Sequence, residues 1–280
     1  MIYAIARAPR FSPNSTERDA LIFQAVVKSL LLQGQPVHTL DEALLPDTLP
    51  SAQLVLSMGR DAHTLRRLAA IEAQGIPVLN SAAALQRATR AHLDSLAQSL
   101  GVGCRHLSGA PSLEAIEQTV GYPLWLKRSD ACAQSAADVR FIPDRDALTA
   151  GLSDFAQRGI RDFVAAEHIE GDLVKFYGVA DTDFFHTLLP TAEGGFSKFG
   201  LEQYNGAPRG HAFSPAALKQ QADAIGRASG MVIYGGDVIV RPDGRLAIVD
   251  FNDFPSFSPC VPEAAEAIAH RALAALRQKH

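Results

Sequence analysis

Cysteine is scarce in this sequence and follows no pattern. The 280 residues include three cysteines, which lie far apart at Cys104, Cys132 and Cys260. An odd number without metal-ligand spacing excludes a disulfide scaffold and a zinc module, and it is typical of reduced thiols. The beginning of the chain lacks the basic region that precedes the apolar core of a secretory signal. We therefore expect a cytoplasmic protein.

Long hydrophobic runs and basic clusters are missing too. No apolar run approaches the roughly 20 residues that cross a bilayer, so we expect no membrane partner. The net charge is −4, the pI is about 6.1 and no basic block occurs. Nucleic acid is therefore not an expected partner either. The composition leaves the oligomeric state open, with a homodimer as one option.

What the sequence does contain is enough apolar residues, 47%, for two or three packed subdomains. Strand and helix patterns follow the order β-α-β-β-α-β over the first 80 residues. This order predicts a small parallel α/β layer, which we assign to a first domain over residues 1–88. Its strands are expected at 2–7, 36–40, 54–57 and 76–79, and its main helices after the capping-box sequence at 14–17 and at 61–74.

Mixed strand and helix patterns continue through the rest of the chain, which we divide into domains 89–172 and 173–280. Strands are expected at 123–128, 138–142, 163–166, 173–180 and 183–189, and helices at 81–100, 144–157, 214–229 and 262–278. The predicted fold class is α/β combined with α+β. Residues 191–213 show no period, and a loop of this length is usually a functional lid or a disordered segment.

The most informative stretch is an apolar strand that ends in Asp250-Phe-Asn252. Residues two apart on a strand point to the same face, so the side-chain oxygens of Asp250 and Asn252 should lie side by side. The hairpin signal at 241–245 should fold Asp237 back toward Asp250. Hard oxygen ligands of this kind suit Mg²⁺. Because Asp-x-Asn is also common in turns that only cap the backbone, both interpretations stay open here.

Four motifs along the chain are similar to those of the ATP-grasp family. They are Gly75-Ile-Pro-Val-Leu-Asn-Ser81, Pro123-Leu-Trp-Leu-Lys127, Glu167-His-Ile-Glu-Gly-Asp172-Leu-Val-Lys175 and Asp250-Phe-Asn252-Asp-Phe-Pro255. The resemblance covers nearly the whole chain and implies an ATP-grasp fold, with residues 1–88 as the small α/β domain that precedes its core. The last motif resembles the inositol trisphosphate 5/6-kinase branch, and the chain is also similar to RimK-like ligases.

The resemblance implies ATP and Mg²⁺ as cofactors, with two metal ions expected. The implied metal ligands are Asp237, Asp250 and Asn252. The implied nucleotide-binding residues are Arg90, Lys127, Glu167, Ile169, Asp172 and Lys175.

Each implied nucleotide contact has a physical reason. Lys127 would place a point charge from a rigid strand beside the α- and β-phosphates, and Lys175 would reach the γ-phosphate. The segment 167–169 resembles the hinge that pairs with adenine, and Asp172 would accept a hydrogen bond from the ribose. Arg90 stands where the family often has a lysine. The small residues of the loop 129–136 would allow close approach to phosphate, although this loop lacks the glycines usual in the family.

Three basic residues are candidates for binding the acceptor substrate. Arg60 follows the strand at 54–57, and ligands bind beyond the carboxyl ends of parallel strands. Lys198 and Arg209 lie in the loop 191–213, which could close over the acceptor. Because phosphoryl transfer depends on positioning and charge neutralisation, the expected catalytic residues are Lys127, Lys175 and Arg209. Surface lysines and arginines are also commonly only solvated charges.

Two reactions fit these parts. A carboxylate–amine ligase would form an acyl phosphate that an amine captures, whereas a kinase would phosphorylate a hydroxyl of a sugar or inositol phosphate. Asp250 favours the kinase, because amide-forming members usually have glutamate there. The lack of clustered basic residues for a polyphosphate favours the ligase, which we prefer. A third hypothesis is a nucleotide-binding regulator without turnover, against which the intact set of metal ligands argues.

Overall fold

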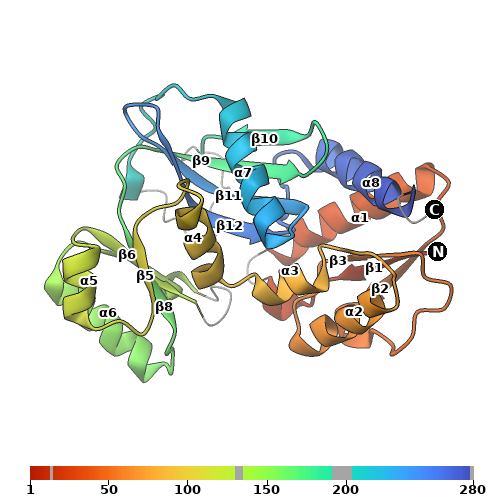
Figure 1. The fold of residues 1–280 in the computed structure, drawn as a ribbon, viewed down its shortest axis with the longest axis horizontal. Coiled ribbons are helices and arrows are strands. Elements are labelled where there is room, and N and C mark those ends of the chain that lie inside the picture. The colour runs from red at the N-terminus through yellow and green to blue at the C-terminus, as the bar shows by residue number, and fades with distance from the viewer. Residues whose placement is uncertain (13–14, 130–134, 191–203, 278–280) are drawn as a thin grey trace.

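The computed structural model describes residues 1–12, 15–129, 135–190 and 204–277 of the chain. Within these ranges the strands form three four-stranded sheets that follow one another along the chain. Figure 1 shows the N-terminal sheet and its helices on the right, the central sheet and its helices on the left, and the C-terminal sheet above both. The predicted combination of α/β and α+β structure is confirmed.

The N-terminal sheet is parallel, as the alternating strand and helix patterns predict. Its order is β2 (Val37–Asp41), β1 (Ile2–Ala6), β3 (Leu54–Ser57) and β4 (Val78–Leu79). One face is covered by α1 (Thr16–Leu32) and α8 (Val261–Arg277), and the other by α2 (Ala62–Ala73) and α3 (Ala82–Arg87). The 3₁₀ turns η1 (Pro9–Phe11) and η2 (Glu42–Leu44) follow β1 and β2. The carboxyl ends of β1 and β3 therefore share one edge.

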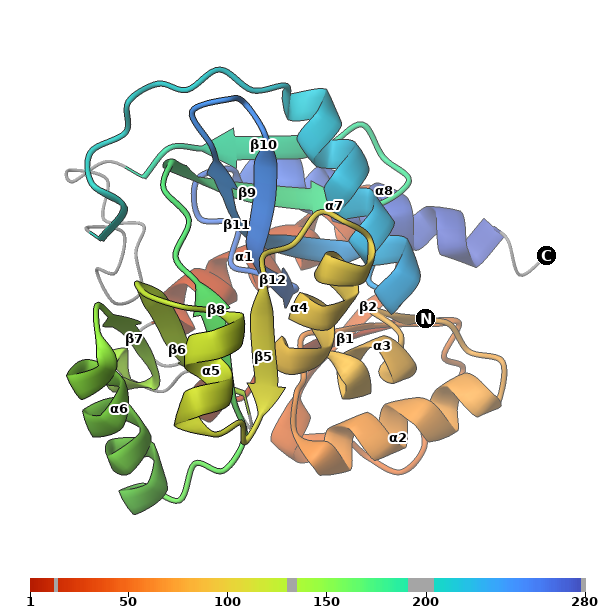
Figure 2. The same cartoon turned by 60° about the vertical axis from the view of Figure 1, so that its left-hand side comes forward.

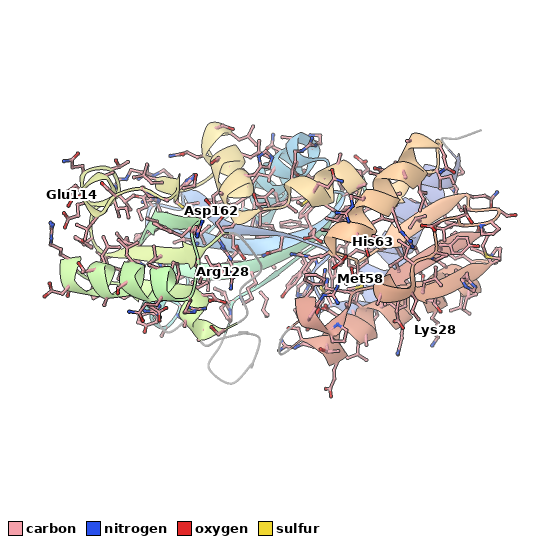
Figure 3. The ribbon with its side chains drawn as sticks, turned by 90° about the horizontal axis from the view of Figure 1, so that it is seen from below. Lys28, Met58, His63, Glu114, Arg128 and Asp162 are labelled. Atoms are coloured by element: carbon pink, nitrogen blue, oxygen red, sulfur yellow. The ribbon has the colours of Figure 1, made fainter. Side chains whose placement is uncertain are left out.

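The central sheet is antiparallel. Its order is β5 (His106–Gly109), β8 (Phe163–Glu167), β6 (Leu124–Arg128) and β7 (Val139–Ile142), with η3 (Ala136–Asp138) before β7. The helices α5 (Leu113–Thr119) and α6 (Arg145–Gln157) pack on it through apolar side chains such as Ile116 and Phe155. The sequence analysis missed β5 and α5, whose four and seven residues are too short to show a clear period. In Figure 3, Glu114 of α5 lies at one end of the molecule and Arg128 toward its middle.

The C-terminal sheet is also antiparallel and contains the predicted hairpin. Its order is β10 (Phe185–Leu188), β9 (Asp172–Val179), β11 (Ile233–Val240) and β12 (Leu246–Asp253). In the turn between β11 and β12, Arg241 N–H donates to Arg245 O at 2.9 Å and Gly244 N–H donates to Arg241 O at 2.8 Å. One face of this sheet buries its aromatic side chains under α7 (Pro215–Ser229) and α4 (Arg90–Ser99).

Two helices pack across the domain limits that the sequence predicts. The helix α4, assigned to 89–172, buries Leu93 and Ala97 against the C-terminal sheet, and Figure 2 shows it beside β12. The helix α8, assigned to 173–280, shares its core with α1 and the N-terminal sheet. The limits 1–88, 89–172 and 173–280 stay a prediction, although the hydrophobic cores do not follow them at these helices. In the described part of the chain, no helix is long and apolar enough to cross a membrane.

Arg7, directly after β1, ties the N-terminal sheet to the end of β12. Its Nε donates to Met58 O at 3.0 Å, and its Nη2 donates to Phe254 O at 2.9 Å. Its Nη1 pairs with Asp19 at 2.9 Å, and its Nη2 lies 3.8 Å from an oxygen of Asp253. The Arg7 side chain is 8% exposed and that of Asp253 is 2% exposed. Loss of one partner of such a pair leaves the other charge buried and unbalanced.

We expect Arg7→Met to lower the free energy of unfolding by about 3–5 kcal/mol, because it leaves Asp19 and Asp253 short of a buried partner. Urea unfolding of the ligand-free protein measures this loss. The matched control is Arg66→Met on the exposed face of α2, which should change stability by no more than about 0.5 kcal/mol. Equal effects of the two substitutions would contradict the role of Arg7.

Candidate active site

The site begins as a row of charged side chains across three neighbouring strands. Lys175 on β9 lies directly opposite Asp237 on β11, which in turn lies opposite Asp250 on β12. Directly opposite residues of an antiparallel sheet share one face, with neighbouring Cβ atoms about 5 Å apart. The Nζ of Lys175 lies 3.2 Å from Oδ1 of Asp237. The prediction that the hairpin folds Asp237 back toward Asp250 is therefore confirmed.

A β-bulge beside this row makes a backbone carbonyl available to the central sheet. The pairing between β11 and β12 shifts between Asp237 and Val238, which leaves Val249 as the extra residue of β12. The carbonyl oxygen of Val249 accepts a hydrogen bond from Nζ of Lys127 at 2.9 Å. Because Lys127 belongs to β6, this bond joins the central and C-terminal sheets at the site.

Asn252 completes the predicted set of oxygen ligands. Its amide Nδ2 donates to Oδ2 of Asp250 at 2.6 Å, so the two side chains lie side by side as the strand spacing predicts. The described residues contain no group of three or more His, Cys, Asp or Glu that could hold a metal ion. The set of Asp237, Asp250 and Asn252 fits Mg²⁺, which is usually held by one or two carboxylates while phosphates and waters supply its other ligands.

Two glycines on β11 lie beside this row, Gly235 on the same face of the sheet as Asp237 and Gly236 on the opposite face. A Cβ atom at Gly236 would overlap the carbonyl oxygen of Asp250, and one at Gly235 would come within 2.8 Å of Pro255 Cγ. Gly236 lies opposite Phe251 and Gly235 lies opposite Asn252. The close approach of β11 and β12 therefore requires glycine at Gly236, and the packing of Pro255 and β9 against β11 requires glycine at Gly235.

Arg90 adds a cation from α4. Thr89 caps this helix by accepting a hydrogen bond from His92 N–H at 3.3 Å, and Arg90 follows with its Nη1 2.7 Å from Oδ1 of Asp250. Burial raises the pKa of Asp250, but Arg90 and Lys127 lower that pKa more, so it lies below its ordinary value. Burial lowers the pKa of Arg90, but the carboxylates of Asp250, Asp94 and Asp237 together raise it above its ordinary value. Both groups are therefore charged at neutral pH.

Asp94, one turn after Arg90, is a buried acid that the sequence analysis missed. The residue is 7% exposed, and burial raises its pKa although Lys127 and Arg90 act in the opposite direction. Its Oδ2 makes no hydrogen bond to any described residue. The only signal in the sequence is an acidic residue beside apolar Leu93, four positions after an arginine.

The charged row lines a cavity of about 850 Å³. The central and C-terminal sheets and the segment between β8 and β9 contribute an apolar side to this cavity, formed by Trp125, Ile169, Leu173, Ile239 and Val249. Glu167 lies on the same side, and its carboxylate accepts a hydrogen bond from Arg105 N–H at 2.9 Å and pairs with the Arg105 guanidinium at 3.2 Å. The two predicted hinge residues, Glu167 and Ile169, thus share a cavity with the charged row.

The N-terminal domain lines the opposite part of the cavity, which we call its N-terminal side. Arg60 lies there, as its place after β3 predicts, and it pairs with buried Asp253. Arg7, Arg10 and Arg18 also line this side, and the sequence analysis singled out none of them. Arg7 follows β1 just as Arg60 follows β3, so the strand-end rule could have identified it. Arg10 lies on η1 and Arg18 lies on α1, so the positions of these two elements in the fold bring both arginines to the cavity.

Two predicted site residues, Asp172 and Arg209, are not brought into this cavity. Asp172 does not line it, because its carboxylate accepts hydrogen bonds from Arg209 N–H and His211 N–H, each at 2.7 Å. Arg209 is exposed and does not line the cavity either. This geometry gives no support to a ribose contact for Asp172 or to a catalytic or substrate role for Arg209. Lys198 lies outside the described residues, as do 130–134 of the loop 129–136.

The fold and the site define a class of protein in which two antiparallel lobes and a parallel N-terminal domain surround one charged cavity. No family model matches the chain, and no curated protein matches it. Among solved structures, a RimK-domain ATP-grasp protein from Sphaerobacter thermophilus is similar, with a TM-score of 0.66 at 20% identity, covering 98% of this chain and 100% of that one.

D-alanine–D-alanine ligase from Bacillus anthracis is similar as well. One structure gives a TM-score of 0.65 at 13% identity and covers 99% of this chain and 96% of the ligase. A second, complexed with ATP, gives a TM-score of 0.69 at 12% identity and covers 99% of this chain and 97% of the ligase. The chain therefore has the ATP-grasp fold over nearly its whole length, as its four motifs predict.

The lowered pKa of Asp250 predicts how stability depends on pH. A carboxylate whose pKa is lower in the folded state stabilises that state above its ordinary pKa of about 3.9, and this contribution disappears as the pH falls through the folded pKa. Urea unfolding of the native protein and of Asp250→Asn should therefore differ most at neutral pH and converge below about pH 4. The control Asp183→Asn, in the exposed turn after β9, should show a small difference throughout. A difference for Asp250→Asn that stays constant with pH would contradict this prediction.

Proposed function

We propose that this protein is an ATP- and Mg²⁺-dependent carboxylate–amine ligase that acts through an acyl phosphate. The observation that carries the proposal is that Lys127, Lys175, Asp237, Asp250 and Asn252 line one cavity in an ATP-grasp fold. The similar Bacillus anthracis protein is a ligase, and one of its structures contains ATP. These findings support the class of reaction.

In this proposal the nucleotide lies along the cavity from its apolar side to the charged row. Ile169, Trp125 and Leu173 would enclose the base, with the backbone of 167–169 at its edge. Lys127 and Arg90 would bind the phosphate oxygens, because both side chains end at the metal-ligand carboxylate Asp250 or beside it. Asp237, Asp250 and Asn252 would hold Mg²⁺, with two ions expected, and the metal would supply charge neutralisation at the β- and γ-phosphates.

The charged row then positions the reaction. Lys175, held beside Asp237, would stabilise the charge that develops on the transferred phosphoryl group. The acceptor carboxylate oxygen forms a bond to the γ-phosphorus while the bond to ADP breaks. The amine nitrogen next forms a bond to the acyl carbon, inorganic phosphate leaves, and the nitrogen loses a proton. The buried walls of the cavity would keep water from the acyl phosphate.

A kinase is the second candidate function, and one observation favours it. Asp250 stands where amide-forming members usually have glutamate, so the shorter side chain at this metal position is shared with the inositol trisphosphate kinase branch. In that reaction a hydroxyl oxygen would attack the same γ-phosphorus, and the phosphorylated acceptor would be the final product. The two reactions use the same nucleotide site and differ in the acceptor group and in the amine capture that follows only in the ligase.

Mg-ATP should stabilise the protein by binding to the folded state. At a concentration 100 times its Kd, this stabilisation is about 2.7 kcal/mol, which raises the Tm by roughly 5–10 °C. Lys127→Met should remove most of this shift, because the substitution deletes the charge nearest the phosphates. Lys28→Met, on the exposed face of α1 and not among the residues that line the cavity, should retain it. Differential scanning fluorimetry measures both, and no shift at millimolar Mg-ATP would overturn nucleotide binding.

Trapping with hydroxylamine separates the ligase from the kinase. A protein that forms acyl phosphates should convert members of a panel of mono- and dicarboxylic acids to hydroxamates in the presence of Mg-ATP, with one ADP per hydroxamate. Asp250→Asn and Asn252→Ala should each lower this rate at least about 100-fold, because both remove metal ligands. ADP formation with a phosphorylated hydroxyl compound and no hydroxamate would instead support the kinase.

A further inference from the structure

An aromatic cluster lies on the face of the central sheet that borders the cavity. Trp125 on β6 lies directly opposite Phe141 on β7 and Ala166 on β8, so the three side chains share one face. Trp125 and Ala166 line the cavity. The ring centroids of Trp125 and Phe141 are 5.4 Å apart at an interplanar angle of 69°, an edge arrangement that aromatic pairs favour. The indole of Trp125 thus forms part of the cavity wall.

His168, the first residue after β8, binds the polar atom of this indole. Its backbone N–H donates to Pro123 O at 3.1 Å, which continues the pairing of β8 with β6. Its Nδ1 accepts a hydrogen bond from Nε1–H of Trp125 at 3.1 Å. Because tryptophan has no other side-chain atom that forms hydrogen bonds, the indole is left with only apolar surface for a ligand in the cavity.

The ring of His168 is neutral in this arrangement. Because the indole N–H can only donate, Nδ1 of His168 carries no proton, and the ring proton lies on Nε2. Burial lowers the pKa of His168 more than the charge of Glu170 raises it, so the pKa lies below its ordinary value. The form of His168 that accepts the hydrogen bond is therefore the one present at neutral pH.

Tyr204, between β10 and α7, adds another ring to the surroundings of Trp125. Its ring stacks on Phe141 with centroids 4.8 Å apart, and it meets the indole edge-on at 5.6 Å. Asn205, the next residue, lines the cavity. Ring contacts of this kind tolerate a range of orientations, whereas the hydrogen bond to His168 is directional. The orientation of the indole is therefore fixed chiefly by His168.

We propose that His168 is a positioning residue of the nucleotide site, and that its hydrogen bond holds the Trp125 indole as the wall against which the nucleobase lies. A fixed apolar ring suits a flat purine, because aromatic rings gain from offset stacking as well as from burial. A wall that is already oriented also avoids the cost of ordering a side chain on binding. His168 belongs to the segment 167–169 at the edge of the base, so one segment would set both the edge and the wall. This inference rests on the proposed function, since it takes the apolar side of the cavity as the nucleobase site.

Two substitutions of His168 separate the hydrogen bond from the ring. His168→Phe keeps a ring beside Phe141 and removes the acceptor, so the Kd for Mg-ATP should rise about fivefold, the effect of one lost hydrogen bond. His168→Asn restores an acceptor near the place of Nδ1, and its Kd should stay within about twofold of native. The control His63→Phe, on the exposed first turn of α2 and not among the residues that line the cavity, should leave the Kd unchanged. Titration calorimetry of the native protein and the three variants measures these constants.

Tryptophan fluorescence reports on the same hydrogen bond independently of affinity. Trp125 is the only tryptophan of the sequence, so tryptophan emission comes from this site alone. Without Mg-ATP, the emission maximum of His168→Phe should differ from that of the native protein, and that of His168→Asn should resemble it, because only His168→Phe deprives the indole N–H of its partner. Mg-ATP should change the emission of the native protein, since the base would lie against the indole.

Weaker binding by His168→Phe together with rescue by His168→Asn supports the positioning role. Three results would each overturn this inference alone: native affinity in His168→Phe, equal weakening by His168→Phe and His168→Asn, or tryptophan emission that Mg-ATP leaves unchanged in a protein that binds it. Absence of Mg-ATP binding by the native protein would overturn the proposed function, and this inference with it.

Discussion

The site depends on the balance of opposite charges across β9, β11 and β12. Lys175, Asp237 and Asp250 lie next to one another in register, and Arg90 and Lys127 approach from α4 and β6. None of these charges is stable in a partly buried cavity by itself, because desolvation disfavours an isolated ion. Each therefore fixes its neighbours, and the C-terminal sheet, α4 and the central sheet are positioned around the same point.

The bond from Lys127 to the bulged carbonyl of Val249 connects two sheets that share no strand. A similar role belongs to Arg7, which connects the N-terminal sheet to the end of β12. Both contacts reach β12 within six residues of each other, on either side of Asp250 and Asn252. The strand β12 thus contacts the central sheet just before Asp250 and the N-terminal domain just after Asn252, so the three parts of the molecule meet around these two side chains.

The parts of this arrangement that depend on residues close together in the chain could be predicted from the sequence. The Asp-Gly turn at 241–245 fixes the hairpin, and the two-residue period places Asp250 beside Asn252. Other features depend on contacts between distant segments. Asp172 follows the hinge motif in the chain, yet its carboxylate binds the backbone at 209–211. Arg10 and Arg18 look like ordinary surface charges until η1 and α1 bring them to the cavity, and no periodicity indicates that α4 packs on the C-terminal sheet.

The two glycines of β11 restrict where the sequence around this site can change. Any side chain at Gly235 or Gly236 would collide with Pro255 or with the Asp250 backbone, so the floor beneath the charged row tolerates almost no variation. The residues of η1 and the start of α1 lie on turns and helix surface, where replacements leave the backbone undisturbed. Sequence change in descendants of this chain should therefore be easier on the N-terminal side of the cavity than at the charged row.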